Sequence, residues 1–220
     1  MENLNLILPE IFLSLSIFAT LLIGVFFKNS YTLVTNIVYI IIISLLLIIF
    51  NSFNNSGNLF SNSFISNSFT NFFKILILLG TLFVMLITQT FIKEMKINYF
   101  EYPLLILFSV LGMFFMVSSN DLMSFYLGLE LQSLALYILA SIDRNNLKSN
   151  ESGIKYFVLS ALSSGLLLYG CSLLYGFTGS TNFEEIKLKM EFENTGAIFA
   201  MVFILAGLAF KVSAVPFHMW

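Results

Sequence analysis

The amino-acid sequence predicts an all-α membrane protein with about seven transmembrane helices. Hydrophobic residues make up 58% of the 220 residues, charged residues only 10%, and the mean hydropathy is +0.93. This composition leaves too little polar surface to cover a water-soluble globule. The apolar residues also fall into runs of roughly 20, the length that a helix needs to cross a bilayer core about 30 Å thick. Short polar turns separate these runs.

The first three spans are expected over about residues 6–27, 31–50 and 72–92. Pro9 lies in the opening turn of the first span, where a helix tolerates proline. The amino end has neither the cationic segment nor the small-residue cleavage site of a removable signal peptide, so the first span is expected to stay. Residues 51–71, rich in Asn, Ser and Phe, indicate a loop near the membrane interface, to which we assign no chemistry.

The remaining spans are expected over about residues 103–117, 121–140, 152–175 and 195–211. Between the last two, Thr181 and Glu184 have the spacing of a capping box, which predicts a short helix on the membrane surface. This layout gives two parts, residues 1–101 with three helices and residues 102–220 with four.

The distribution of Lys and Arg predicts the orientation, because cytoplasmic loops carry an excess of these residues. One side of the membrane holds six cations and the other holds three. The six are Lys28, Lys93, Lys96, Arg144, Lys148 and Lys155, and the three are Lys74, Lys187 and Lys189. The amino terminus is therefore expected on the outer side.

Composition also excludes several functions. The net charge of −2 comes from few charges and leaves no basic patch, so we expect a lipid bilayer and no nucleic acid as partner. The single cysteine, Cys171, permits neither a disulfide framework nor a thiolate metal site. The sequence contains no Gly-rich phosphate loop or Ser-His-Asp arrangement, so it locates no substrate chemistry and no cofactor on this chain.

Glu130 is the first functional candidate, because it lies in the middle of the apolar run 121–140. On a helix it shares one face with Tyr126, Ser133 and Tyr137, which makes a polar stripe that cannot face lipid. A charge at the bilayer centre costs about 2.5 to 3.5 kcal/mol, so it is usually kept for a partner, an ion path or a proton relay. The alternative is a protonated glutamate hydrogen-bonded between packed helices.

Lys211 is the second candidate. Pro216 cannot donate a backbone hydrogen bond and crowds the carbonyl of Val212, so the seventh helix is expected to break beside Lys211. Broken membrane helices are tolerated where protein or a water-filled cavity surrounds them. A Glu-Lys pair whose separation changes can act as a proton switch. The alternative is a structural lysine held by the carbonyls of a helix end.

Two further residues are weaker candidates. Lys155, near the start of the sixth span, either takes part in the proton path or extends to the membrane interface, as long cations near helix ends do. His218, the only histidine, lies just past Pro216, where a neutral imidazole can relay protons. A packing role for His218 stays open, because a lone histidine offers neither metal-ligand spacing nor a triad.

Two segments of the chain resemble a known family. They read GLELQSLALYILASIDRNNLKSNESGIKYFVLSALSSGLLLYGCSLLYGFTGSTNF and AGLAFKVSAVPFHMW. Both strongly resemble subunit N of the proton-pumping NADH:quinone oxidoreductase, whose mitochondrial counterpart is NADH dehydrogenase subunit 2. The resemblance is close over residues 119–220, and before them only the hydrophobic layout and the opening LPEIFL agree.

The resemblance implies an antiporter-like membrane-arm subunit of respiratory complex I, built in this family from two inverted five-helix repeats. Glu130 and Lys211 match the functional pair of the first half-channel. A lysine on helix eight and the whole second repeat are absent, so the fold is expected to be truncated within the first repeat, with a carboxy-terminal half as partner. NADH, FMN, iron-sulfur clusters and quinone would lie in other subunits. The implied location is the bacterial inner membrane or the mitochondrial inner membrane.

Two other hypotheses stay open. One is a subunit of a multi-subunit cation/proton antiporter, which shares the helix pattern, although the segments ELQSLALY and LKSNESGIKYF favour the oxidoreductase. The other is a seven-helix structural or receptor protein. The intramembrane charges Glu130 and Lys211 argue against this last hypothesis.

Overall fold

The computed structural model describes residues 5–27, 30–94, 98–190 and 195–217. Over these residues the chain forms eight α-helices and one two-stranded hairpin. In chain order they are α1 (Leu8–Phe26), α2 (Ser30–Asn51), β1 (Gly57–Leu59), β2 (Phe64–Ser66), α3 (Ser68–Glu94), α4 (Glu101–Ser118), α5 (Leu122–Ala140), α6 (Leu147–Thr178), α7 (Phe183–Lys189) and α8 (Thr195–Lys211).

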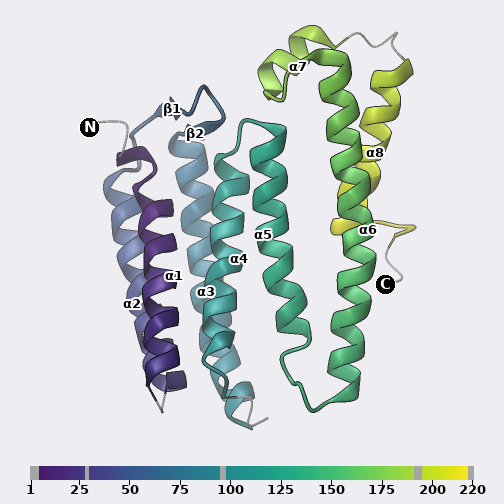
Figure 1. Ribbon diagram of the computed structural model, residues 1–220. Coiled ribbons are helices and arrows are strands. Elements are labelled where there is room, and N and C mark those ends of the chain that lie inside the picture. The colour runs from purple at the N-terminus through teal and green to yellow at the C-terminus, as the bar shows by residue number, and fades with distance from the viewer. Residues whose placement is uncertain (1–4, 28–29, 95–97, 191–194, 218–220) are drawn as a thin grey trace.

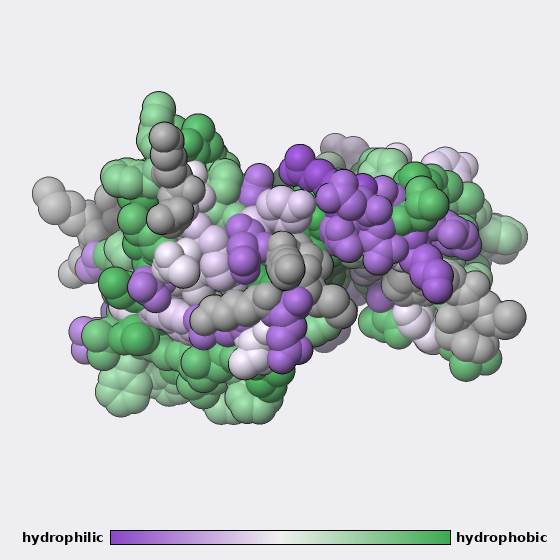
Figure 2. Space-filling view, turned by 90° about the horizontal axis from the view of Figure 1, so that it is seen from below, coloured by the Kyte–Doolittle hydropathy of each residue, from purple (hydrophilic) through white to green (hydrophobic). Residues whose placement is uncertain are grey.

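The helices α1 to α6 and α8 run roughly along one common direction, as Figure 1 shows. Among the described residues, six helices are long and apolar enough to cross a membrane, and α8, with 17 residues, is a shorter apolar helix. Large apolar side chains such as Phe18, Leu47 and Phe83 are exposed along the sides. In Figure 2 hydrophilic residues gather over the middle of one end and hydrophobic residues surround them. The chain is an integral membrane protein of the predicted class.

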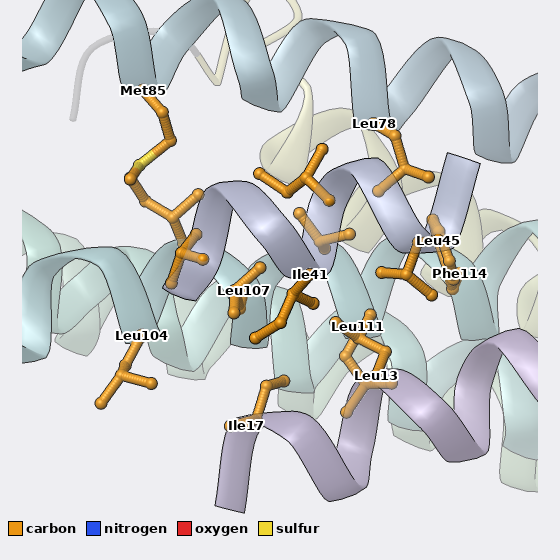
Figure 3. Close-up of a cluster of buried hydrophobic side chains, with 14 of the residues drawn as sticks. Leu13, Ile17, Ile41, Leu45, Leu78, Met85, Leu104, Leu107, Leu111 and Phe114 are labelled. Atoms are coloured by element: carbon orange, nitrogen blue, oxygen red, sulfur yellow. The ribbon is translucent and has the colours of Figure 1, made fainter. Parts of the chain in front are cut away.

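Two hydrophobic clusters hold the helices together. The larger one lies among α1 to α4, where residues such as Leu13, Leu45, Leu78 and Leu107 are fully buried (Figure 3). The smaller one lies among α5 to α8 and is centred on residues such as Leu167. Because no water competes for hydrogen bonds inside a bilayer, each helix satisfies its own backbone and these clusters decide which helices pack together.

Helices α4 and α5 join the two clusters at very close range. A Cβ atom added to Gly112 of α4 would lie 2.5 Å from the backbone nitrogen of Gln132 and 2.7 Å from the carbonyl oxygen of Gly128, both in α5. Small residues at such a contact let two helix backbones approach each other. The position of α5, which contains Glu130, is therefore set by α4.

Polar side chains fix where several helices begin. Asp121 caps α5 by accepting hydrogen bonds from the backbone nitrogens of Met123 at 2.8 Å and Ser124 at 3.4 Å. Asn146 caps α6 in the same way through Lys148 at 3.0 Å. Helix α6 therefore begins at Leu147, earlier than the predicted 152, because an asparagine oxygen satisfies a free backbone N–H group of the first turn.

The segment predicted as a loop, residues 51–71, is more ordered than expected. It forms the antiparallel β1–β2 hairpin, and α3 begins at Ser68 rather than at about residue 72. The reason is a reciprocal cap: the Thr70 nitrogen donates to Asn67 Oδ1 and the Asn67 nitrogen donates to Thr70 Oγ1, both at 2.9 Å.

The prediction of a capping box at Thr181 was wrong. Helix α7 is capped by Asn182, whose side chain accepts from the Glu184 nitrogen at 3.0 Å. The Thr181 hydroxyl instead donates to the carboxylate of Asp121. Thr181 is therefore used to connect the α6–α7 loop with the start of α5.

Candidate functional site

The two charges singled out from the sequence lie together inside the protein. The Lys211 ammonium donates to Glu130 Oε1 at 3.2 Å, across 81 positions of sequence. The lysine side chain is 12% exposed and the glutamate side chain 20% exposed. Both side chains are therefore mostly buried. The cost of placing each charge inside an apolar helix is offset by the opposite charge beside it.

The end of α8 brings Lys211 to this place. The helix ends at Lys211, five residues before Pro216, and residues 212–217 form turns, as the predicted break required. A Cβ atom on Gly207 would lie 3.0 Å from the carbonyl oxygen of Ser163, so α8 packs closely on α6. Lysine at the carboxyl end of a helix is also favoured by the helix dipole.

Two hydroxyl groups of α5 complete the surroundings of the ammonium. Lys211 Nζ also donates to Ser133 Oγ at 3.2 Å and to Tyr137 Oη at 3.1 Å. Three members of the predicted polar stripe therefore contact Lys211, while the fourth, Tyr126, packs against the smaller hydrophobic cluster. An ammonium group has three donors, and here each has an acceptor.

Sequence reasoning missed two serines of α6 that belong to the site. Ser164 Oγ donates to Glu130 Oε1 at 2.5 Å, and Tyr137 Oη donates to Ser160 Oγ at 2.5 Å. The signal was present, because residues 160, 163 and 164 are all serine and share one face of a helix within an apolar run. The site therefore contains one acid, one base and a shell of hydroxyl groups from two helices.

This arrangement can hold a proton on the lysine and can stabilise the glutamate as an anion, because each charged group keeps several hydrogen bonds. Hydroxyl groups both donate and accept, so they can remain bonded to either protonation state of a neighbour. Within the described residues no group of three or more His, Cys, Asp or Glu side chains is placed to hold a metal ion.

The weaker candidates lie elsewhere. Lys155 forms an ion pair with Glu151 at 2.5 Å, and both side chains are more than 60% exposed, at 65% and 62%. The structure does not bring Lys155 together with Glu130, so its role in a proton path stays a prediction. His218 lies outside the described residues, and its role also stays a prediction.

A second buried ion pair was not expected from the sequence. Glu10 of α1 and Lys74 of α3 lie 2.6 Å apart, with side chains 2% and 0% exposed. The Lys74 ammonium also lies 5.4 Å from the centre of the Phe64 ring and 5.9 Å from that of Phe114. Lys74 was counted among the interfacial cations, and without it the count of Lys and Arg becomes six against two.

Comparison with known proteins identifies the family. Residues 119–220 match the family described as NADH:quinone oxidoreductase/Mrp antiporter, transmembrane. The chain is 58% identical over 221 residues to NADH-quinone oxidoreductase subunit N of Pelagibacter ubique (strain HTCC1062), covering 100% of this chain and 47% of the relative. It is 52% identical to subunit N of Bartonella bacilliformis (strain ATCC 35685 / KC583 / Herrer 020/F12,63), covering 99% of this chain and 45% of the relative.

Solved structures agree with this result. A chain of respiratory complex I from Thermus thermophilus with bound Aureothin aligns with a TM-score of 0.80 and 27% identity, over 96% of this chain and 45% of that one. A chain of the Mrp complex from Dietzia sp. DQ12-45-1b aligns with a TM-score of 0.78 and 21% identity, over 99% of this chain and 42% of that one, which shows a shared fold. The chain spans about half the length of the curated relatives it matches. The protein therefore belongs to the NADH-quinone oxidoreductase subunit N family and corresponds to the amino-terminal half of its members.

Proposed function

We propose that this chain contributes part of a proton half-channel to a proton-translocating NADH:quinone oxidoreductase. The observation that supports the proposal most directly is the Glu130–Lys211 pair, enclosed by hydroxyl groups within membrane-spanning helices. Intramembrane acid-base pairs are rare and costly, and they usually mark ion paths and proton relays.

The chemistry follows from the charges. While Lys211 is protonated, its ammonium and the Glu130 carboxylate attract each other across 3.2 Å. When the proton leaves, the lysine becomes neutral and this attraction is lost, while Ser164 still donates to the carboxylate. The pair therefore has two charge states with different preferred separations, and a change elsewhere in a complex can drive one into the other.

The rest of the pump would lie outside this chain. We place the electron carriers, FMN and iron-sulfur clusters, together with the NADH and quinone sites, in partner subunits. Other membrane-arm subunits and a carboxy-terminal half of this subunit would complete the assembly. Within the chain, residues 1–101 would provide three supporting helices and residues 102–220 an incomplete first antiporter-like repeat. The membrane would be the bacterial inner membrane or its mitochondrial equivalent.

The second candidate function is a subunit of a multi-subunit cation/proton antiporter. The fold shared with the Mrp complex chain favours it, but that alignment has only 21% identity. The 58% identity to a subunit N favours the oxidoreductase. Co-purification separates them, because only the oxidoreductase subunit would be isolated with flavin and iron-sulfur subunits.

The function is tested by proton uptake in vesicles that contain the complete complex. Lys211→Met and Glu130→Gln keep the side-chain size and remove the charge, and each is expected to lower the protons moved per NADH oxidised by roughly tenfold or more. Lys187→Met and Glu184→Gln, which change exposed residues of α7, are the matched controls. Normal pumping by Lys211→Met in assembled complex would overturn the proposal.

A further inference from the structure

Tyr137 occupies a distinctive place beside the Glu130–Lys211 pair. Its side chain is buried, with 5% of the residue exposed, and its hydroxyl has two different polar neighbours. The oxygen accepts a hydrogen bond from Lys211 Nζ at 3.1 Å, and the hydrogen is donated to Ser160 Oγ at 2.5 Å. Proton transfer through a hydroxyl group requires one hydrogen bond accepted from the proton donor and one donated to the next group. The Tyr137 hydroxyl has both.

The ring of Tyr137 is held from α6. It makes edge contacts with Tyr156, at 4.8 Å between ring centres, and with Phe157, at 5.8 Å. Such edge-to-face pairs fix the plane of a ring. The hydroxyl can therefore turn about its C–O bond while the oxygen stays beside Lys211.

Tyr137 also borders an open hollow of about 500 Å³ between α5 and α6. The polar groups of the hollow, from Ser141 and Asn150, lie toward the α5–α6 turn, while Ile138, Ile154 and Phe157 make the rest of its lining apolar. The polar end of the hollow, beside Ser141 and Asn150, has both the space and the hydrogen-bonding partners that water needs, since a water occupies about 30 Å³ of the liquid. Tyr137 lines this hollow and also contacts Lys211, which is not part of its lining.

We propose that Tyr137 is the hydroxyl through which Lys211 exchanges protons with water in this hollow. The inference deepens the proposed function and rests on it. The Lys211 ammonium gives a proton to Tyr137 Oη, and the N–H bond electrons remain on nitrogen as a lone pair. In the same step the original tyrosine proton, turned away from Ser160, passes to a water molecule, which becomes hydronium. Tyrosine ends neutral, lysine ends as the amine, and uptake is the reverse.

The first test is Tyr137→Phe in the complete complex, compared with Tyr126→Phe. Both tyrosines lie on α5 and both changes remove one hydroxyl, but only Tyr137 contacts Lys211. Tyr137→Phe is expected to lower the rate of proton uptake per assembled complex by roughly tenfold, because the proton loses its carrier. Tyr126→Phe is expected to stay within about twofold of the natural protein.

The second test asks whether water reaches Tyr137. In a Cys171→Ser background, Tyr137→Cys is expected to react with a small, water-soluble thiol reagent, because position 137 lines the hollow. Ser133→Cys, equally buried on the same helix but not part of that lining, is expected to stay unmodified. A thiol at position 137 that does not react, as in a hollow filled by lipid chains or by another helix, would overturn the inference.

The two proposals fail in different ways. If Lys211→Met stops pumping but Tyr137→Phe pumps as well as Tyr126→Phe, only the role of Tyr137 is wrong. If Lys211→Met itself pumps normally, the proposed function is wrong. A lower amount of assembled complex with an unchanged uptake rate per complex would show that Tyr137 is structural, which also overturns the inference.

Discussion

Among the described residues, two Glu–Lys pairs join different apolar helices, and they differ in distance, burial and neighbours. Glu10 and Lys74 lie 2.6 Å apart and are 2% and 0% exposed. Glu130 and Lys211 lie 3.2 Å apart and are 20% and 12% exposed. The first pair joins α1 to α3 within the larger hydrophobic cluster, and the second joins α5 to α8 next to Tyr137, which lines an open hollow.

Their neighbours explain what the difference means. The rings of Phe64 and Phe114 lie near Lys74 and offer only the attraction of their faces for a cation. Lys211 contacts the hydroxyl groups of Ser133 and Tyr137, which can either donate or accept a hydrogen bond when the charge of a neighbour changes. Ion pairing alone therefore does not identify a proton site. We expect the first pair to fix helix packing and the second to exchange protons.

The largest expected effect comes from breaking the first pair. Lys74→Met leaves the Glu10 carboxylate buried without its partner, and removing one member of a buried pair typically costs about 3 to 5 kcal/mol. Because whole-protein stability is usually only about 5 to 15 kcal/mol, the amount of assembled subunit in the membrane should fall severalfold. Quantitative immunoblotting of isolated membranes measures this amount.

The control for this prediction is the double variant Glu10→Gln with Lys74→Met. It contains no uncompensated charge, so it should assemble better than Lys74→Met alone, and its assembled fraction should pump normally. A double variant that assembles well but does not pump would place Glu10 and Lys74 on a proton path and would remove the contrast between the two pairs.

A smaller effect is expected at the contact that joins the two regions. In Gly112→Ala the new methyl group meets backbone atoms of α5 at 2.5 Å and 2.7 Å, which cannot move as a side chain can. Overpacking of this kind costs about 1 to 3 kcal/mol. Gly165→Ala is the matched control, because no heavy atom lies within 4 Å of the added carbon.

The Gly112→Ala subunit should unfold at a lower temperature in detergent than the Gly165→Ala subunit, as followed by the loss of helical circular dichroism. Proton uptake should also be slower in Gly112→Ala, because α5 holds Glu130 and would shift relative to α8. Equal unfolding temperatures would mean that the two helices can separate slightly without cost.

How much could be predicted from the sequence differs between these two regions. Glu130 and Lys211 stood out because each interrupts an apolar run at mid-span or beside a proline, and the structure brings them together. Lys74 was misjudged because it lies near the start of its helix, where a lysine can also extend to the membrane surface. Only the three-dimensional packing of α1 to α4, which places Glu10 beside Lys74, distinguishes these two cases.

The hydroxyl groups show a second limit. Serine is common in membrane helices and usually bonds to its own backbone, as Ser163 does at 3.0 Å to the carbonyl of Ser160. Spacing can therefore place Ser160 and Ser164 on one face, but it cannot say which face meets Glu130. That choice depends on how α6 is rotated between α5 and α8, which is decided by contacts far apart in the sequence.

The smallest expected effect concerns Lys155, whose exposed pair with Glu151 lies within a single helix, four residues apart. Such pairs contribute little to stability, because water screens both charges and either side chain can find other partners. The exposure favours extension to the interface over a place on the proton path. Lys155→Gln should thus change the protons moved per NADH by less than about twofold, while Lys211→Gln, the same substitution in the enclosed pair, should nearly stop pumping. Measuring both variants in the same vesicles compares an exposed and an enclosed lysine directly. A loss in Lys155→Gln as large as that in Lys211→Gln would show that α6 brings Lys155 onto the path in the complete complex, and exposure in this chain would then be a poor guide to which lysines exchange protons.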